Sequence, residues 1–325
     1  MDAGYTSAKA YGQNYSLVDQ SAARTTTIKF TGKEDLGGGM KASFNLESDV
    51  NTDTGSLSAA SGGKLFGRKS NVALSGNFGE LKLGKDIDQI FLQGFVDNIR
   101  NSHSASGFMA HALGDYAFYN TGSDYVNQQS VFTQNMVRYT TPTFNGFKVA
   151  VQHSFGEIAG QTSQNKATGV LANYAVGGVT LAAGTKKVKD VLAGDWGTGY
   201  DTKLTYLGAT YTTGPYKFAA TYHKSKWEHN GTTDMTLKTS EVGAAYTINP
   251  KLVAALNYVQ QKLDADTKSN IKSASLKYSL SKRTSLWTLV SRTGKDSLAL
   301  GANYANADQT AGPASSYSVG VTHSF

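Results

Sequence analysis

The last nine residues of the chain, 317–325, alternate one by one between large apolar or aromatic side chains and small or polar ones, and the last is Phe325. Successive side chains of a β-strand point to opposite sides, so Tyr317, Val319 and Val321 would line one surface and the small polar residues between them the other. Terminal residues usually fray in water. The pattern therefore predicts a terminal strand that belongs to a wall, with one apolar face and one wet face.

The same alternation recurs through the chain. In residues 41–49, Ala42, Phe44 and Leu46 alternate with polar or charged side chains, among them Lys41 and Glu47. Segments 27–31, 147–152, 216–223 and 252–258 read the same way, whereas 204–212 and 285–290 are ambiguous by this test. One face of each predicted strand is compatible with lipid, and the other carries charge.

The number of strands can be predicted from the short turn signals in the sequence. They are centred near residues 37, 77, 144, 177, 214, 249 and 282, and seven such turns imply eight hairpins, hence sixteen strands. Longer polar stretches lie between them, at 50–64, 156–166, 187–201, 228–234 and 293–316. Short turns at one end and long loops at the other are typical of an outer-membrane β-barrel. The interval between the second and third turns is the longest, and its excess, near residues 87–130, indicates a functional loop.

Composition agrees with an all-β chain. It has 35 Gly, 18 Tyr and 14 Phe but only 4 Pro, which fits many short strands joined by turns and does not fit helices. No stretch approaches the roughly 18 consecutive apolar residues of a transmembrane helix, but a barrel strand needs only about 10 residues that are apolar at alternate positions. The alternative is a soluble all-β binding protein whose aromatic residues form a core.

Charge and motifs give little sign of chemistry. The net charge is +7, but the basic residues are scattered and only residues 186–189 resemble a run, so we expect no nucleic-acid partner. Without Cys there is no thiolate nucleophile or zinc-thiolate site. The six His show no metal-ligand spacing, and no phosphate loop or nucleophile elbow occurs, so no catalytic residue, metal or cofactor is predicted. A barrel hydrolase with Ser and His on facing strands stays open, because such groups meet only in space.

Several longer stretches resemble one family. They are residues 32–39, 66–68, 74–84, 137–147, 280–284 and 323–325, including Leu-Ser-Gly-Asn-Phe-Gly at 74–79 and the terminal His-Ser-Phe. Over nearly its whole length the chain resembles the trimeric general porins of Gram-negative outer membranes, specifically the β-proteobacterial branch. The resemblance implies a single domain over residues 1–325, built as a sixteen-stranded antiparallel transmembrane barrel with an inward-folded third loop. It also implies a homotrimer in the bacterial outer membrane, in contact with lipid and lipopolysaccharide, that passes inorganic ions and small hydrophilic solutes by passive diffusion.

Two departures from the family pattern stand out. Family members carry more of the first strand ahead of Asp2-Ala3-Gly4, so we expect a clipped first strand here. The basic position of the family's second strand falls on Thr27, with Lys29 two residues along on the same face.

The resemblance also indicates where the pore narrows. The constriction loop would cover about 87–130, with its tip near 108–116 and Asp115 as the acidic group. The opposing basic wall would be Lys29, Arg68 and Arg138, with Lys41 and Lys82 flanking it and Glu47 as an acidic neighbour. Alternation back from Val72 and Leu74 would instead point Lys69 into the lumen in place of Arg68, unless a bulge shifts the register. Acid on the loop and base on the wall would set up a transverse field, and the excess of base predicts anion preference. By the same resemblance, the terminal Phe325 would serve as the signal that the assembly machinery reads.

Overall fold

The computed structural model describes residues 1–10, 13–20, 25–57, 63–97, 99, 131–156, 164–193, 197–264, 267–294 and 314–325. Seventeen strands and one helix lie in these ranges. They are β1 (Asp2–Ala10), β2 (Gln13–Gln20), β3 (Thr27–Gly37), β4 (Met40–Asp49), β5 (Lys69–Gly76), β6 (Gly79–Ile87), α1 (Gln89–Asp97), β7 (Phe132–Thr140), β8 (Phe147–Ser154), β9 (Ala167–Val176), β10 (Val179–Ala193), β11 (Gly197–Thr213), β12 (Tyr216–His229), β13 (Thr232–Asn249), β14 (Leu252–Leu263), β15 (Thr267–Ser279), β16 (Thr284–Thr293) and β17 (Ala314–His323).

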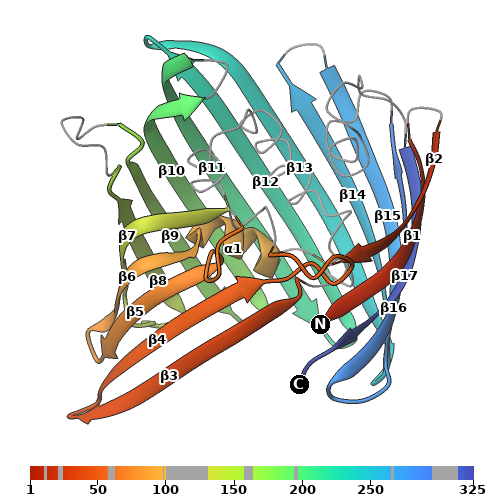
Figure 1. The fold of residues 1–325 in the computed structure, drawn as a ribbon, viewed down its shortest axis with the longest axis horizontal. Coiled ribbons are helices and arrows are strands. Elements are labelled where there is room, and N and C mark those ends of the chain that lie inside the picture. The colour runs from red at the N-terminus through yellow and green to blue at the C-terminus, as the bar shows by residue number, and fades with distance from the viewer. Residues whose placement is uncertain are drawn as a thin grey trace.

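The strands form one antiparallel sheet that curves into a barrel, in which β1 pairs with both β17 and β2 (Figure 1). The second strand of the barrel is interrupted, and β2 and β3 are its two parts. Gln20 at the end of β2 faces Ala3, and Thr26, just before β3, accepts a hydrogen bond from the backbone N–H of Asp2 at 2.8 Å. β3 then continues this barrel strand beside β4. When β2 and β3 are counted as one, the seventeen strands in the described part of the chain make sixteen barrel strands. This confirms the predicted sixteen-stranded barrel.

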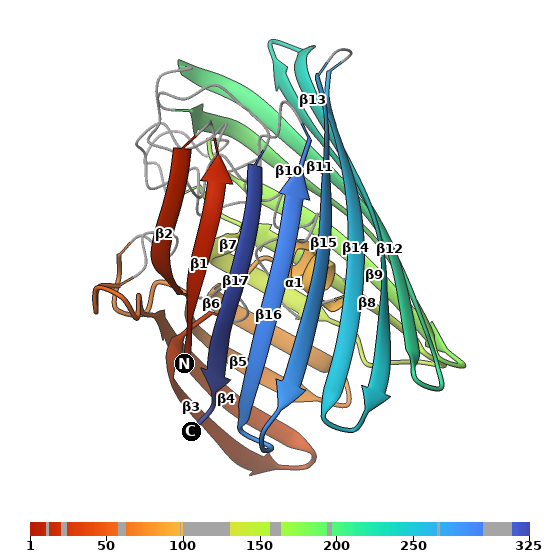
Figure 2. The same cartoon turned by 90° about the vertical axis from the view of Figure 1, so that its right-hand side faces the viewer.

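All seven predicted short turns join consecutive antiparallel strands at one end of the barrel, as Figure 2 shows for several of them. The prediction of long loops is wrong for two stretches, 187–201 and 228–234. β10 and β11 extend through most of 187–201, and β12 and β13 meet at a two-residue turn, Asn230 and Gly231, whose φ angles are 50° and 81°. Asn-Gly at positive φ is the turn that a tight hairpin requires. Polar strand ends resemble loops in sequence because both of their faces are hydrophilic.

The two faces of the wall follow the predicted alternation. On β17, Tyr317, Val319 and Val321 are 48%, 42% and 41% exposed, whereas Ser318 is buried. Leu207 and Tyr211 on β11 and Leu286 and Val290 on β16 are also exposed, which places the two ambiguous segments in the same pattern. In water such an apolar surface would be costly, but it suits the hydrocarbon of a bilayer.

Helix α1 lies inside the barrel, against the inner faces of β10, β11 and β12 (Figures 1 and 2). Composition did not predict it. Its Ile90 is fully buried and packs with Leu171, Ala182 and Tyr206 of the wall. On the wall, Gly208 leaves room for the helix, since a side chain there would overlap the carboxylate of Asp97 and the hydroxyl of Tyr206. The helix opens the segment between β6 and β7, so the described start of the third loop lies inside the barrel, as predicted. Within the described residues no helix is long and apolar enough to cross a membrane.

Candidate functional site

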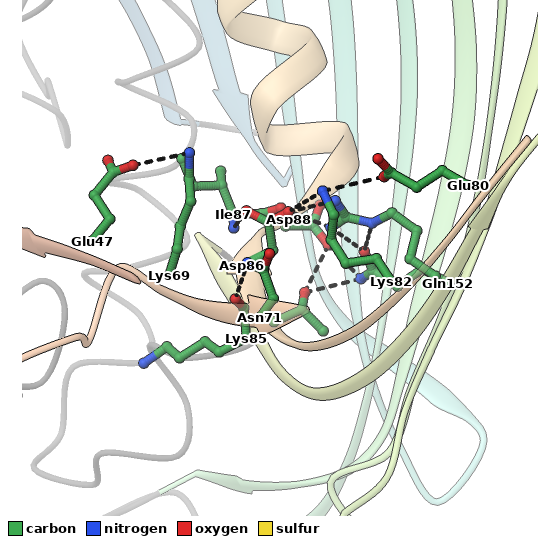
Figure 3. Close-up of polar contacts among 12 residues, drawn as sticks. Glu47, Lys69, Asn71, Glu80, Lys82, Lys85, Asp86, Ile87, Asp88 and Gln152 are labelled. Carbon is green, nitrogen blue, oxygen red and sulfur yellow. Dashed lines mark hydrogen bonds and ion pairs between the residues drawn. The ribbon is translucent and has the colours of Figure 1, made fainter. Parts of the chain in front are cut away.

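The inward loop leaves the wall at two aspartates, Asp86 and Asp88. Asp86 Oδ2 lies 3.0 Å from Lys82 Nζ and 3.2 Å from Arg138 Nη1, and its other oxygen accepts the Ile87 N–H (Figure 3). Arg138 also donates to the Ile87 carbonyl at 2.8 Å and to Gln152 Oε1 at 2.6 and 2.9 Å. The guanidinium is buried, and these contacts use four of its five N–H donors. It therefore fixes the direction in which the chain leaves β6.

Asp88 connects the N-terminus of α1 to Lys186 of β10. Its Oδ1 accepts the backbone N–H groups of Ile90 and Phe91, the geometry of a helix N-cap. Its Oδ2 accepts Lys186 Nζ at 2.8 Å and Gln152 Nε2 and Thr133 Oγ1 at 3.1 Å each. Burial would raise the pKa of the Asp88 carboxyl, but the ammonium of Lys186, the guanidinium of Arg138 and the hydrogen bonds to the carboxylate together outweigh it and hold the pKa below its usual value. Asp88 is thus an ionised, fully bonded anchor for α1.

The other end of α1 is anchored on β11, the strand next to the one that carries Lys186. Tyr206 of β11 donates a short hydrogen bond to Asp97 Oδ2, and Gln93 Nε2 donates to Asp97 Oδ1 at 2.9 Å. Burial raises the pKa of Asp97, although both hydrogen bonds act in the other direction. Two residues on, Asn257 of β14 donates to the Ile99 carbonyl at 3.2 Å. The loop therefore crosses the barrel interior from β6 to β14 and narrows the space through which water can pass.

A second charged cluster surrounds Glu47 on the inner face of β4. Its carboxylate lies 2.6 Å from Arg68 Nε, 3.2 Å from Lys69 Nζ and 3.3 Å from Lys29 Nζ. The side chain of Glu47 is only 4% exposed, whereas that of Lys29 is 47% exposed and reaches the open interior. Arg68 precedes the first residue of β5, so it is not bound by the alternation of that strand. Arg68 and Lys69 consequently both face inward, where both pair with Glu47. The two alternatives for the residue that faces the lumen are therefore compatible.

We call the charged groups of these two clusters, together with Glu80 and Lys85, the constriction wall. This set of nine side chains has six cations and three anions, a net charge of 6 − 3 = +3. Asp49, which is buried on the same face of β4, is outside the set, and the buried pair of Lys186 and Asp88 adds no net charge. The cations are Lys29, Arg68, Lys69, Lys82, Lys85 and Arg138, and the anions are Glu47, Glu80 and Asp86. Lys85 Nζ lies 5.6 Å from the ring centre of Phe132, within the range of a cation–π contact.

The structure brings most of the predicted site residues to this wall. Lys41 is apart from it, since it lies six residues from Glu47 along β4, or about 20 Å, near a short turn. Asp115 and the predicted loop tip lie outside the described residues. Phe325 is 90% exposed at the end of the chain, where its ring meets that of His323.

Sequence reasoning missed the residues that hold the loop: Asp86, Asp88, Gln152 and Lys186. One signal was available. Asp88 is followed by an apolar stretch at 90–92, which is how a capped helix begins. For metal binding the result is negative within the described ranges, which contain no group of three or more His, Asp or Glu placed to hold an ion.

An antiparallel barrel with an apolar outer face, a charged interior and a loop folded into its lumen defines a membrane diffusion channel. The family model described as Gram-negative porin matches residues 1–296, and the chain belongs to that family. It is 28% identical to outer membrane porin protein 32 of Delftia acidovorans over 99% of this chain and 90% of that protein. The anion-selective porin from Comamonas acidovorans has the same fold, with a TM-score of 0.84, 24% identity and coverage of 100% of this chain and 97% of that one. OmpF of Salmonella typhi in complex with daunomycin shares it at a TM-score of 0.69 and 16% identity, over 100% and 96% of the two chains.

The protein is therefore an outer-membrane porin, which is a channel and not an enzyme. Membership of this family also places it in the bacterial outer membrane.

Proposed function

We propose that the pore is anion-preferring and passes ions and small hydrophilic solutes by passive diffusion. The observation that carries the proposal is the +3 charge of the constriction wall, with Lys29 open to the interior beside the inserted loop. A low-dielectric wall focuses that field into the lumen, which raises the local concentration of anions. A related fold with 24% identity carries the description anion-selective, which agrees in direction.

Liposome swelling tests passive diffusion directly. Vesicles that contain the refolded protein should swell in isotonic sugar at a rate that falls steeply with the size of the sugar and does not saturate with concentration, because transport through a wet pore involves no binding step. Swelling that saturates for one sugar would contradict a general pore. With a soluble all-β protein the vesicles would stay impermeable to sugar and would not swell.

We also propose a homotrimer in contact with outer-membrane lipid and lipopolysaccharide. The support is family resemblance together with the apolar outer face, where Ile28, Phe30 and Val72 are each more than half exposed. Native mass spectrometry of the protein extracted in mild detergent should give three times the chain mass. A single chain mass under conditions that keep the barrel folded would contradict the trimer.

Removal of Phe325 should impair assembly in cells far more than it destabilises the folded barrel. The residue is 90% exposed and its ring contacts only that of His323 among the described aromatic groups, so it contributes little to packing. We expect little folded protein in the outer membrane for the deletion and a normal yield for Phe325→Tyr, which keeps a terminal aromatic. Equal yields of the deletion and the wild type would show that the terminal aromatic is not read.

A further inference from the structure

Three glycines lie on the inner wall of the barrel where the inserted loop crosses it. Gly184 of β10, Gly208 of β11 and Gly243 of β13 face inward, because their chain neighbours on the outer side are exposed, as Leu207 and Val242 are at 50% and 54%. A glycine inside a strand weakens it and often marks a place where another part of the chain comes close. We call these three residues the glycine line.

The glycine line forms one diagonal across the sheet. On β11, Gly208 lies two residues nearer the short-turn end than the residue that pairs with Gly184. On β12, Ala219 lies two residues nearer that end than the partner of Gly208, and it pairs with Gly243. The diagonal therefore crosses four consecutive strands, and the largest side chain on it is the methyl group of Ala219.

The inserted loop follows this diagonal in chain order. A methyl group added at Gly184 would lie 3.2 Å from Ile90 Cδ1, near the start of α1. One added at the second glycine would overlap the Asp97 carboxylate and the Tyr206 hydroxyl, which are hydrogen-bonded to each other. One added at the third would lie 2.8 Å from Ile99 Cγ1. The loop thus occupies the space that three side chains would otherwise fill.

The wall is stiffer than the loop at these positions. β10 is paired on both sides, with β9 and β11, and β13 is paired with β12 and β14. Displacement of either strand would distort two ladders of hydrogen bonds, and a close-packed wall transmits such strain to its neighbours. The loop has the open interior on its other side, where the side chain of Lys29 is 47% exposed. A side chain added to the glycine line would therefore push the loop into the lumen.

We propose that the glycine line fixes how far the third loop stands from the wall and so sets the largest solute that the pore admits. In a barrel this wide, the diameter at the narrowing decides which solutes pass. The inference rests on the proposed function, passive diffusion, and adds to it the positioning residues that determine the size limit. Because glycine carries no charge, the line acts on solute size and leaves ion preference to the constriction wall.

The test measures the swelling of vesicles in a series of neutral sugars of increasing size, with the whole protein and single Gly→Ala variants. Gly184→Ala and Gly243→Ala should slow swelling in the largest permeant sugar at least about twofold more than in the smallest. The effect should be greater for Gly243→Ala, because there the added methyl comes closer to the loop.

Gly169→Ala is the matched control. Gly169 is buried on the inner face of β9, but a methyl group there would lie 3.4 Å from Gln89 Nε2, an ordinary van der Waals distance. The control should therefore show the size dependence of the wild type. Heat-modifiable mobility on gels shows that each variant is folded.

A second-site change separates displacement of the loop from a loss of stability. Ile90→Val removes the Cδ1 atom that the methyl group of Gly184→Ala meets, so the double variant should regain the size dependence of the wild type. It keeps the contact of the same methyl group with the Val170 carbonyl of the wall, 3.0 Å away. A merely destabilising change would not be rescued, because Ile90→Val removes further packing from the core around Leu171.

Unchanged size dependence in the two line variants, an equal effect in the control, or a failed rescue would overturn the glycine line alone. A larger, noisier conductance in the line variants would also overturn it, since that result indicates a loosened loop. If Gly243→Ala does not fold, Gly184→Ala and its rescue decide, because their contacts are milder. A wild type that gives no swelling in any sugar would overturn the proposed function, and the size limit with it.

Discussion

Replacement of Lys186 by Met should release helix α1 from the wall and give channels with larger, noisier conductance. The change leaves the Asp88 carboxylate buried without its cationic partner, and removal of one member of a buried ion pair typically costs about 3 to 5 kcal/mol. Asp88 holds the N-terminus of α1 and contacts three other side chains, so the strain falls on the point where the loop leaves the wall. Single-channel recording reports the conductance, and urea unfolding of the protein in lipid vesicles reports the stability.

The double variant Asp88→Asn/Lys186→Met is the matched control. Asn keeps the N-cap hydrogen bonds through its side-chain oxygen but removes the buried negative charge. It should therefore recover most of the stability and restore a conductance near that of the wild type, and the double-mutant cycle should give a coupling energy of a few kcal/mol. A single variant with unchanged conductance and stability would show that the ion pair does not hold the loop.

The second large effect concerns selectivity. Lys29→Gln/Lys69→Gln removes two of the six cations and lowers the charge of the constriction wall from +3 to +3 − 2 = +1. Arg68 remains to pair with Glu47 at 2.6 Å, so the carboxylate keeps a partner. We expect the reversal potential in a salt gradient to move clearly toward cation preference, because the field at the narrowing scales with the charges that line it.

The control for this variant is Lys187→Gln/Lys189→Gln, which removes the same charge from side chains that pair with Asp201, away from the constriction wall. Its reversal potential should match that of the wild type. If both variants shift equally, the selectivity arises from the overall charge of the protein, and the constriction wall has no special role. Arg138 is unsuited to this test because it is buried and bonded to the base of the loop.

The barrel itself could be predicted because lipid imposes a simple rule on its sequence. Every strand has to present an apolar face outward, so alternation at 317–325 and 41–49 indicated both the strands and their orientation. Six of the seven short turns were marked by Gly, Asn or Pro and the turn near 282 by Ser281, and all seven are where the sequence predicted them. Where strands rise above the membrane, the rule no longer applies. That is why 187–201 and 228–234 read as loops although β10 to β13 extend through them.

The site was harder to predict because its contacts are distant in the chain. Lys186 and Asp88 are 98 residues apart, and nothing in either local sequence indicates the other. Lys186 and Lys187 looked like one basic run, yet alternation sends the first to Asp88 inside and the second to Asp201 outside. Arg138 was predicted as part of an open wall. A strand pattern shows that it faces inward but does not show that Asp86, Ile87 and Gln152 enclose it.

The most direct test is single-channel conductance and reversal potential of the wild-type protein in a planar bilayer under a salt gradient. The account predicts stepwise, ohmic conductance with a reversal potential on the anion side, as a wet pore with a +3 wall requires. Ohmic steps with cation preference would keep the channel and contradict the wall as the source of selectivity. A protein that is folded in the bilayer but passes no current would contradict the pore itself.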